Sequence, residues 1–275
     1  FERLLKRYGN DTATYLLQID YNHFLAFKVN DIETATSNLK KLTERRLNIY
    51  QESRVKMELA DILVFDEKFN RALIYYTQIQ KKVKSDVLAQ EARFKVARTS
   101  YFKGDFVWAK AQVDVLRKST TQLIANDALK MTLLIHDNTL EDSLQTALKK
   151  YAHADLLALQ NKDEEAIAAL SEILTNHKGE KIEDEALLKQ GELYEKTKQF
   201  KKAEANYLAL IQLYKDEILA DDAIYKLAKL YENELQDPQK AKDYYEQILF
   251  DFADSIYFVE ARKKYRMLRG DEIEY

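Results

Sequence analysis

Small and large apolar residues recur along the chain in a fixed order. An alanine is followed four residues later by a large side chain and three residues after that by an aliphatic one, as in Ala72, Tyr76 and Ile79. Offsets of three and four place side chains on one face of an α-helix, so each frame predicts an amphipathic helix. The frames begin at Ala35, Ala72, Ala109, Ala166, Ala203 and Ala241.

The interval between these alanines is 37 or 38 residues, with one exception. A second small residue lies 12 or 13 positions earlier in five frames, at Ala60, Ala97, Ala154, Gly191 and Ala228. Small residues on two antiparallel helices let the helix axes approach closely. Because one hairpin cannot bury both of its faces, consecutive hairpins must stack. The pattern therefore predicts an all-α solenoid of stacked antiparallel helix hairpins rather than an ordinary helical bundle, which has no fixed period.

The exception is the interval between Ala109 and Ala166, which is 57 residues long. The excess over the other intervals is enough for about one helix and a turn. An apolar stripe of Leu129, Leu133 and Leu134 indicates an extra helix over residues 123–136. We therefore predict five parts: the end of a preceding repeat at 1–9, three hairpins at 10–120, an inserted helix at 121–140, three hairpins at 141–250, and a capping helix with a tail at 251–275.

These frames resemble the tetratricopeptide repeat (TPR), most closely in QGELY at 190–194 and GDFVWA at 104–109. The repeat here is longer than the family's usual length of about 34 residues. It also lacks the family's proline between repeats. The resemblance implies a right-handed superhelical solenoid whose first helices line a concave groove that binds a protein or an extended peptide.

Two longer segments, residues 214–228 and 254–263, are similar to repeats of Gram-negative outer-membrane assembly lipoproteins and Tol-Pal-associated periplasmic proteins. This similarity implies a bacterial periplasmic or outer-membrane-associated protein, with a cytoplasmic location as the alternative. Residues 1–9 have the pattern of the last turns of a helix, so we expect the chain to be a fragment. Any membrane association would then come through upstream residues or through a partner.

Composition, charge and motif spacing exclude several classes of protein. The chain has 5 Gly, 1 Pro and no Cys in 275 residues, which is far from collagen-like or Gly/Pro-rich disordered sequences. A net charge of −3 gives no electrostatic case for nucleic-acid binding. No apolar run is long enough to span a membrane. Histidines and carboxylates show neither metal-ligand spacing nor a catalytic arrangement, and the few glycines form no phosphate-binding cluster. We therefore predict no enzyme activity, no metal and no cofactor.

The resemblance assigns partner binding to exposed positions of the first helices. The predicted partner-binding residues are Met57, Phe94, Arg98, Tyr101, Tyr151, Asp155, Leu188, Glu192, Tyr225 and Lys229. Phe94, Arg98 and Tyr101 form the best candidate set, because an aromatic side chain near an arginine can bury area and also pair with a carboxylate. The alternative is that these aromatic residues pack between repeats.

The predicted function is a non-catalytic interaction scaffold within a bacterial cell-envelope assembly. A second hypothesis is a regulatory or substrate-presenting arm of a larger enzyme whose catalytic part lies outside this chain. A third is a carbohydrate or small-ligand binder that uses the 18 tyrosines.

Overall fold

The computed structural model describes residues 1–84, 87–117, 121–139 and 145–271. These residues form fifteen α-helices and no strand, which confirms the all-α prediction. A 3-10 turn at Thr12–Thr14 and a π-helical turn at Leu25–Val29 complete the list. The helices are α1 Glu2–Tyr8, α2 Tyr15–Phe24, α3 Ile32–Thr43, α4 Ile49–Phe65, α5 Phe69–Lys82, α6 Val87–Phe102, α7 Phe106–Leu116, α8 Gln122–Asp137, α9 Thr146–Leu159, α10 Asp163–Asn176, α11 Ile182–Lys196, α12 Phe200–Leu213, α13 Ala220–Asn233, α14 Pro238–Asp251 and α15 Phe258–Arg269.

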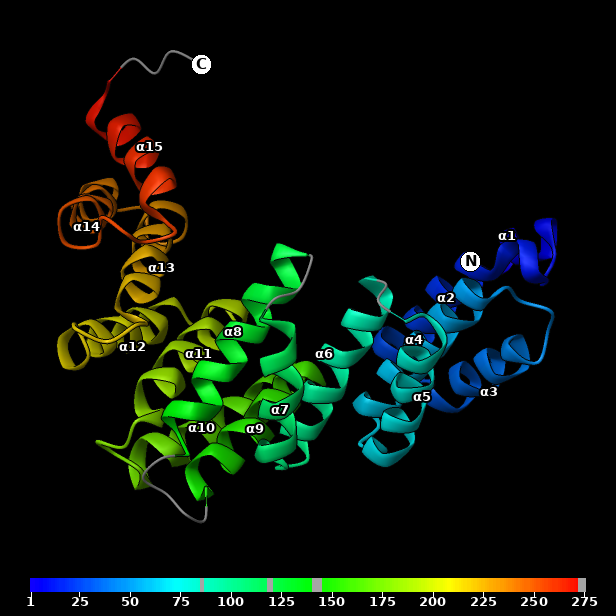
Figure 1. Ribbon diagram of the computed structural model, residues 1–275. Helices are drawn as coiled ribbons and strands as arrows, with labels where there is room; N and C mark the ends of the chain where they lie inside the picture. Colours follow the sequence, from blue (N-terminus) through cyan, green and yellow to red (C-terminus); the bar gives the residue numbers. More distant parts are fainter. Residues whose placement is uncertain (85–86, 118–120, 140–144, 272–275) are drawn as a thin grey trace. The chain divides into compact units, whose positions relative to one another are not determined.

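The chain divides into two compact units, Phe1–Gln160 and Asn161–Tyr275. In the N-terminal unit, α4 packs on α5 and α6 on α7, and α5 contacts α6 (Figure 1). In the C-terminal unit, α11 packs on α12 and α13 on α14, while α12 contacts α13 and α14 contacts α15. Each unit is therefore a stack of hairpins, as predicted. The superhelical hand and the five-part division stay predictions. Of the five predicted parts, residues 85–86, 118–120, 140–144 and 272–275 lie outside the described part of the chain.

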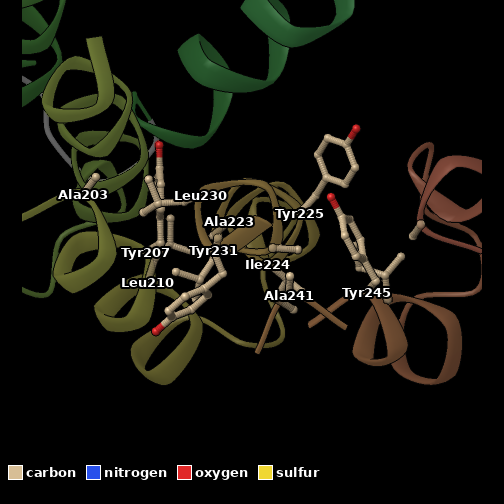
Figure 2. Packing of buried hydrophobic residues seen from close by; sticks show 14 of the residues in the cluster. Ala203, Tyr207, Leu210, Ala223, Ile224, Tyr225, Leu230, Tyr231, Ala241 and Tyr245 are labelled. Atoms are coloured by element: carbon tan, nitrogen blue, oxygen red, sulfur yellow. The ribbon is translucent and has the colours of Figure 1, made fainter. Parts of the chain in front are cut away.

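The alanine frame forms the core. All six frame alanines are 0 % exposed, and so are four of the second small residues, Ala60, Ala97, Ala154 and Ala228. The large and aliphatic members of each frame are buried as well. In the C-terminal unit, Ala203, Tyr207 and Leu210 of α12 belong to one buried cluster with Leu230 and Tyr231 of α13 (Figure 2). The residues that repeat in the sequence are thus those that the stacking removes from water.

The turn before each frame helix has one backbone signature. Five positions before the alanine, the chain enters the left-handed region, with φ between 53° and 81°. The residues there are Asn30, Glu67, Gly104, Asn161, Lys198 and Gln236. Only Gly104 avoids the cost of a Cβ in this conformation, which is about 1 kcal/mol for other residues. Reversing direction within a short connection requires this conformation, and burial of the paired helix faces offsets its cost.

The first hairpin departs from the frame. His23 occupies the small-residue position, yet its side chain is 53 % exposed. Helix α2 continues into the π-helical turn Leu25–Val29, which inserts a residue into the helical repeat and moves the buried face onward. Ala26, within this turn, is the small residue that is 0 % exposed.

The predicted extra helix is present as α8 and packs on α7. Its predicted apolar stripe is only partly buried, since Leu133 and Leu134 are half-buried. The buried residues are Ala128, Thr132 and Ile135, whereas Leu129 is 41 % exposed. Thr132 tolerates burial because its hydroxyl donates to the Ala128 carbonyl at 2.8 Å. Ala128 joins Ala97, Val113 and Leu116 in a small cluster, so a small residue again marks the close contact.

Gly191 lies in close contact with the neighbouring helix α12. A Cβ at this position would lie 2.4 Å from Cε1 and 2.9 Å from Cζ of Tyr207. The Tyr207 ring cannot move aside easily, because it is 0 % exposed and its hydroxyl donates to Glu195. The absence of a side chain at Gly191 therefore lets α11 and α12 pack at this distance.

Replacing Gly191 by alanine is expected to destabilise the chain by about 1 kcal/mol. The gain in helix propensity is about 1 kcal/mol, but overpacking of the Tyr207 ring costs about 1–3 kcal/mol. Urea unfolding followed by circular dichroism measures the difference. In a Tyr207→Leu background the ring is gone, so G191A should become stabilising. A stabilising G191A in the presence of Tyr207 would contradict the contact.

Candidate interaction surface

The first helices of the hairpins form a continuous face in the N-terminal unit. Helix α4 contacts both α2 and α6, and α6 contacts α9 directly. The inserted α8 packs on α7. The extra helix therefore does not separate α6 from α9. We call the surface of α2, α4, α6 and α9 the first-helix face.

Polar contacts to carboxylates connect these helices in sequence. His23 Nδ1 of α2 lies 2.9 Å from Glu58 Oε1 of α4. Lys95 Nζ of α6 lies 2.8 Å from Asp61 Oδ2 of α4. Each contact orients a charged group on the face.

Burial raises the pKa of an acid on this face and the pKa of a tyrosine of α5 that bonds to the face. Burial raises the pKa of Glu58, and the contact with His23 opposes the rise. The Tyr76 hydroxyl donates to Asp61 at 2.6 Å, and burial together with the Asp61 charge raises the pKa of Tyr76. Asp61 therefore accepts from both Tyr76 and Lys95, which holds its carboxylate in one place.

The C-terminal unit repeats the acid–lysine contact. Lys226 Nζ of α13 lies 2.8 Å from Glu192 Oε1 of α11, and Lys264 Nζ of α15 lies 2.7 Å from Glu232 Oε1 of α13. Asp61 and Glu192 directly follow a small frame residue, and each precedes its lysine by 34 positions. The acid–lysine contact was not predicted from the sequence. Alignment of the repeats would have shown an acid after the small residue and a lysine two before the next one.

Tyrosines of the second helices donate hydrogen bonds to carboxylates of the first helices within the same hairpin. Tyr245 of α14 donates to Glu232 of α13 at 2.7 Å, as Tyr76 does to Asp61 in the N-terminal unit. Tyr207 of α12 donates to Glu195 of α11. Burial, and then the hydrogen-bonded carboxylate, raise the pKa values of Tyr207 and Tyr245 above the usual value. Where the large residue of the frame is a tyrosine, it thus supplies both packing volume and a hydrogen bond.

The three residues of the best predicted set, Phe94, Arg98 and Tyr101, do not form one exposed site. Phe94 packs on the cluster that includes Val113 of α7 and Ala128 of α8. Tyr101 is 1 % exposed and its hydroxyl lies 3.3 Å from Asp155. Arg98 is exposed, with its guanidinium 5.4 Å from the centre of the Phe102 ring. Of the three, only Arg98 presents its polar group to solvent.

The other predicted site residues fall into two groups. Met57, Tyr151 and Tyr225 are buried, and Leu188 is half-buried against the C-terminal core. Asp155 and Glu192 are half-buried acids with bonded partners, and Lys229 is exposed with its Nζ 5.5 Å from the centre of the Tyr225 ring. The Tyr225 ring stacks on Tyr257 at 4.1 Å. The aromatic members thus pack in the stack, which was the alternative that the spacing left open. Partner binding by the predicted residues stays a prediction.

Within the described ranges, no group of three or more His, Asp or Glu side chains is arranged to hold a metal ion. Among the helices that the structure describes, none has the length and apolar content needed to cross a bilayer.

The family model of the tetratricopeptide repeat matches residues 185–216 and 222–255. These residues cover α11 to α14, the hairpins in which the alanine frame, the acid–lysine contact and the tyrosine bonds occur together. The match supports TPR repeats in this part of the chain. Since such repeats stack into extended binding surfaces, it also supports a protein–protein interaction scaffold. No curated protein matches the sequence significantly.

Solved structures show only a distant likeness. The TPR domain of P58(IPK) matches with 15% identity and a TM-score of 0.37, covering 92% of this chain and 65% of that one. This chain therefore spans less than two thirds of that structure. PilF of Pseudomonas aeruginosa matches with 11% identity and a TM-score of 0.36 over 94% and 99% of the two chains. BtubC (BKLC) from P. vanneervenii matches with 15% identity and a TM-score of 0.36 over 98% and 94%.

Proposed function

We propose that the chain is a non-catalytic scaffold whose first-helix face in the N-terminal unit binds an extended, acidic peptide segment of a partner protein. The observation that supports this is the pair of exposed arginines on neighbouring first helices, Arg54 on α4 and Arg98 on α6. Arg54, Glu58 and Asp61 lie at helical spacing on one stripe of α4. Lys95 pairs with Asp61 and neutralises its charge. The two arginines can therefore attract the carboxylates of a bound peptide.

Packing supports a preorganised surface. Val55, Leu59 and Ala60 are 0 % exposed, so the backbone that carries Arg54 is held by the core. The contacts of Glu58 with His23 and of Asp61 with Lys95 fix the side chains around it. A surface that is ordered before binding loses less conformational entropy on binding.

The test uses random twelve-residue peptides displayed on phage and selected against the whole chain. Peptides selected on the wild-type protein should be enriched in Asp and Glu. The variant R54E/R98E should weaken their binding by about ten-fold or more, because a charge reversal removes a pair and adds a repulsion. Isothermal titration calorimetry measures the dissociation constants.

Arg71→Glu is the matched control, since Arg71 is exposed on a second helix, α5. Binding by R71E should stay within about two-fold of the wild type. Failure to select any peptide, or equal loss in R71E and R54E/R98E, would overturn the proposal.

The cellular site of this scaffold is a separate part of the proposal. We place it in a bacterial cell envelope, on the similarity of segments 214–228 and 254–263 to envelope-protein repeats. Fractionation of cells that express the full-length protein tests this placement. Recovery in the cytoplasmic fraction would overturn it without affecting the binding proposal.

A further inference from the structure

The large apolar side chains that the C-terminal unit leaves exposed gather at one edge. Seven such side chains are exposed in its described part. Five of them lie in, or within two residues of, the connections between successive hairpins, residues 177–181, 214–219 and 252–257. These five are Leu213, Ile218, Phe250, Ile256 and Val259, and each is between 57 % and 79 % exposed. We call the surface of the three connections and the adjoining helix turns the loop edge.

Contacts between the connections make the loop edge one surface. Lys181 Nζ of the first connection lies 3.3 Å from Glu217 Oε1 of the second. The Tyr257 hydroxyl of the third connection donates to Asp222, which lies in the first turn of α13, directly after the second connection. The two connections that carry exposed isoleucines are therefore neighbours along the same edge.

Packing of the hairpins does not account for the exposed isoleucines. Ile218 and Ile256 each precede the N-cap residue of a first helix, α13 and α15 respectively. An apolar side chain at this position often packs on the first turn of its helix, but these two are 67 % and 78 % exposed. Both lie 15 residues after a frame alanine, where two repeats of the N-terminal unit carry Tyr50 and Val87, which are 52 % and 48 % exposed. An exposed apolar side chain thus recurs at this position in both units and marks a contact surface.

Acidic side chains surround the apolar side chains of the loop edge. Residues 177–185, 213–222 and 250–260 contain eleven Asp or Glu against three Lys and no Arg. Asp216, Asp251 and Asp254 are exposed and form no ion pair with another described residue. Asp251 is the last residue of α14, where a negative charge interacts unfavourably with the helix dipole. The corresponding connection of the N-terminal unit, residues 44–48, carries Arg45 and Arg46, so the acidic charge is particular to the C-terminal unit.

We propose that the loop edge of the C-terminal unit binds a basic amphipathic segment of a partner protein. Aliphatic side chains of the segment cover Ile218 and Ile256, and its Lys or Arg side chains pair with Asp216 and Asp254. The charge of the edge selects this occupant, because the carboxylates repel both an acidic segment and an anionic bilayer surface. The proposal is independent of the first-helix face, which lies in the N-terminal unit and attracts acidic segments.

The probe is a fluorescently labelled amphipathic peptide built only of leucine and lysine, and fluorescence anisotropy measures its dissociation constant with the whole chain at physiological salt. I218S/I256S should weaken binding by about ten-fold or more, because the peptide then covers less apolar surface. D216K/D254K should weaken binding by about the same factor, because two attractions become repulsions. Peptides in which serine replaces leucine, or glutamate replaces lysine, should bind about ten-fold or more weakly than the probe.

Y50S/V87S is the matched control, since both residues are exposed and occupy the same repeat position in the N-terminal unit. This variant should bind the probe within about two-fold of the wild type. Circular dichroism checks that every variant keeps its helices. Hydrogen exchange locates the bound peptide, which should slow exchange at residues 214–219 and 252–257. No binding of the probe, equal loss in Y50S/V87S and I218S/I256S, or slower exchange only outside these two connections would overturn the proposal.

Discussion

Above pH 10 the C-terminal unit is expected to lose its folding free energy steeply. Four of its buried tyrosines, Tyr207, Tyr225, Tyr231 and Tyr245, are at most 7 % exposed. Burial first, and a hydrogen-bonded glutamate second, raise the pKa of each above the usual value. The acceptors are Glu195, Glu260, Glu204 and Glu232, respectively.

The direction of the pH dependence follows from which state, folded or unfolded, binds more protons. Because the folded pKa values are raised, the contribution of these tyrosines is complete below the unfolded pKa of about 10 and is lost as the pH rises above it. At pH 11, each tyrosine that ionises only in the unfolded chain lowers the free energy of unfolding by about 1.4 kcal/mol. Four of them lower it by about 6 kcal/mol, which is comparable to the whole stability of many domains.

Urea unfolding at a series of pH values between 9 and 11 measures this slope, and tyrosinate absorbance reports ionisation. Y207F/Y245F removes two of the titrating groups, so its slope should be shallower than that of the wild type, while its stability near neutral pH decreases by about 2–4 kcal/mol. Lysine deprotonation affects both proteins equally and cancels in the comparison. Equal slopes in the two proteins, or tyrosinate absorbance rising before the helical signal is lost, would contradict the prediction.

Ala203→Trp is expected to lower the free energy of unfolding by about 3 kcal/mol. Ala203 is 0 % exposed at the contact of α12 with its neighbours (Figure 2). The gap in which its methyl group lies cannot hold an indole unless the helices separate, and overpacking of this kind costs about 1–3 kcal/mol or more. For a unit of this size the melting temperature should fall by roughly 6–12 °C. Thermal unfolding followed by circular dichroism measures it.

Ala205→Trp is the matched control, because Ala205 is exposed on the same helix two residues away. The two variants have equal composition and helix propensity, so A205W should melt within about 2 °C of the wild type. Equal melting temperatures for A203W and A205W would mean that the alanine frame does not mark the buried face of α12.

The periodic part of the fold was predictable from the sequence. Close approach of two helices requires a small side chain at the crossing, and stacking requires the same geometry in every repeat. The alanines and their partners at offsets of four and seven therefore had to recur, and they lie in the core. The prediction was less accurate wherever the period was broken, as at His23 and along α8. There, a π-helical turn and a small-residue contact at Ala128 shift the buried face by an amount that no repeat specifies.

The candidate site was predictable only in part. The first helices were identified correctly as the helices that form one face, since their register follows from the frame. Which of their side chains reach solvent was not, because an aromatic residue at helical spacing has the same pattern whether it packs inward, as Phe94 and Tyr101 do, or is exposed. The acid–lysine contacts between successive helices join residues 32 or 34 positions apart, and their energy depends on a distance that the period alone does not give.

The sequence alone determined that this chain is helical, repeated and stacked, and that the residues of the alanine frame are removed from water, because burial of a periodic apolar face is a local property summed over each helix. Only the tertiary structure decided which polar groups meet across that stack and which apolar groups remain outside it. Ile218 shows the difference. Its identity is plain in the sequence, but its exposure follows from where the connection between α12 and α13 lies, and that is set by contacts between helices rather than within one.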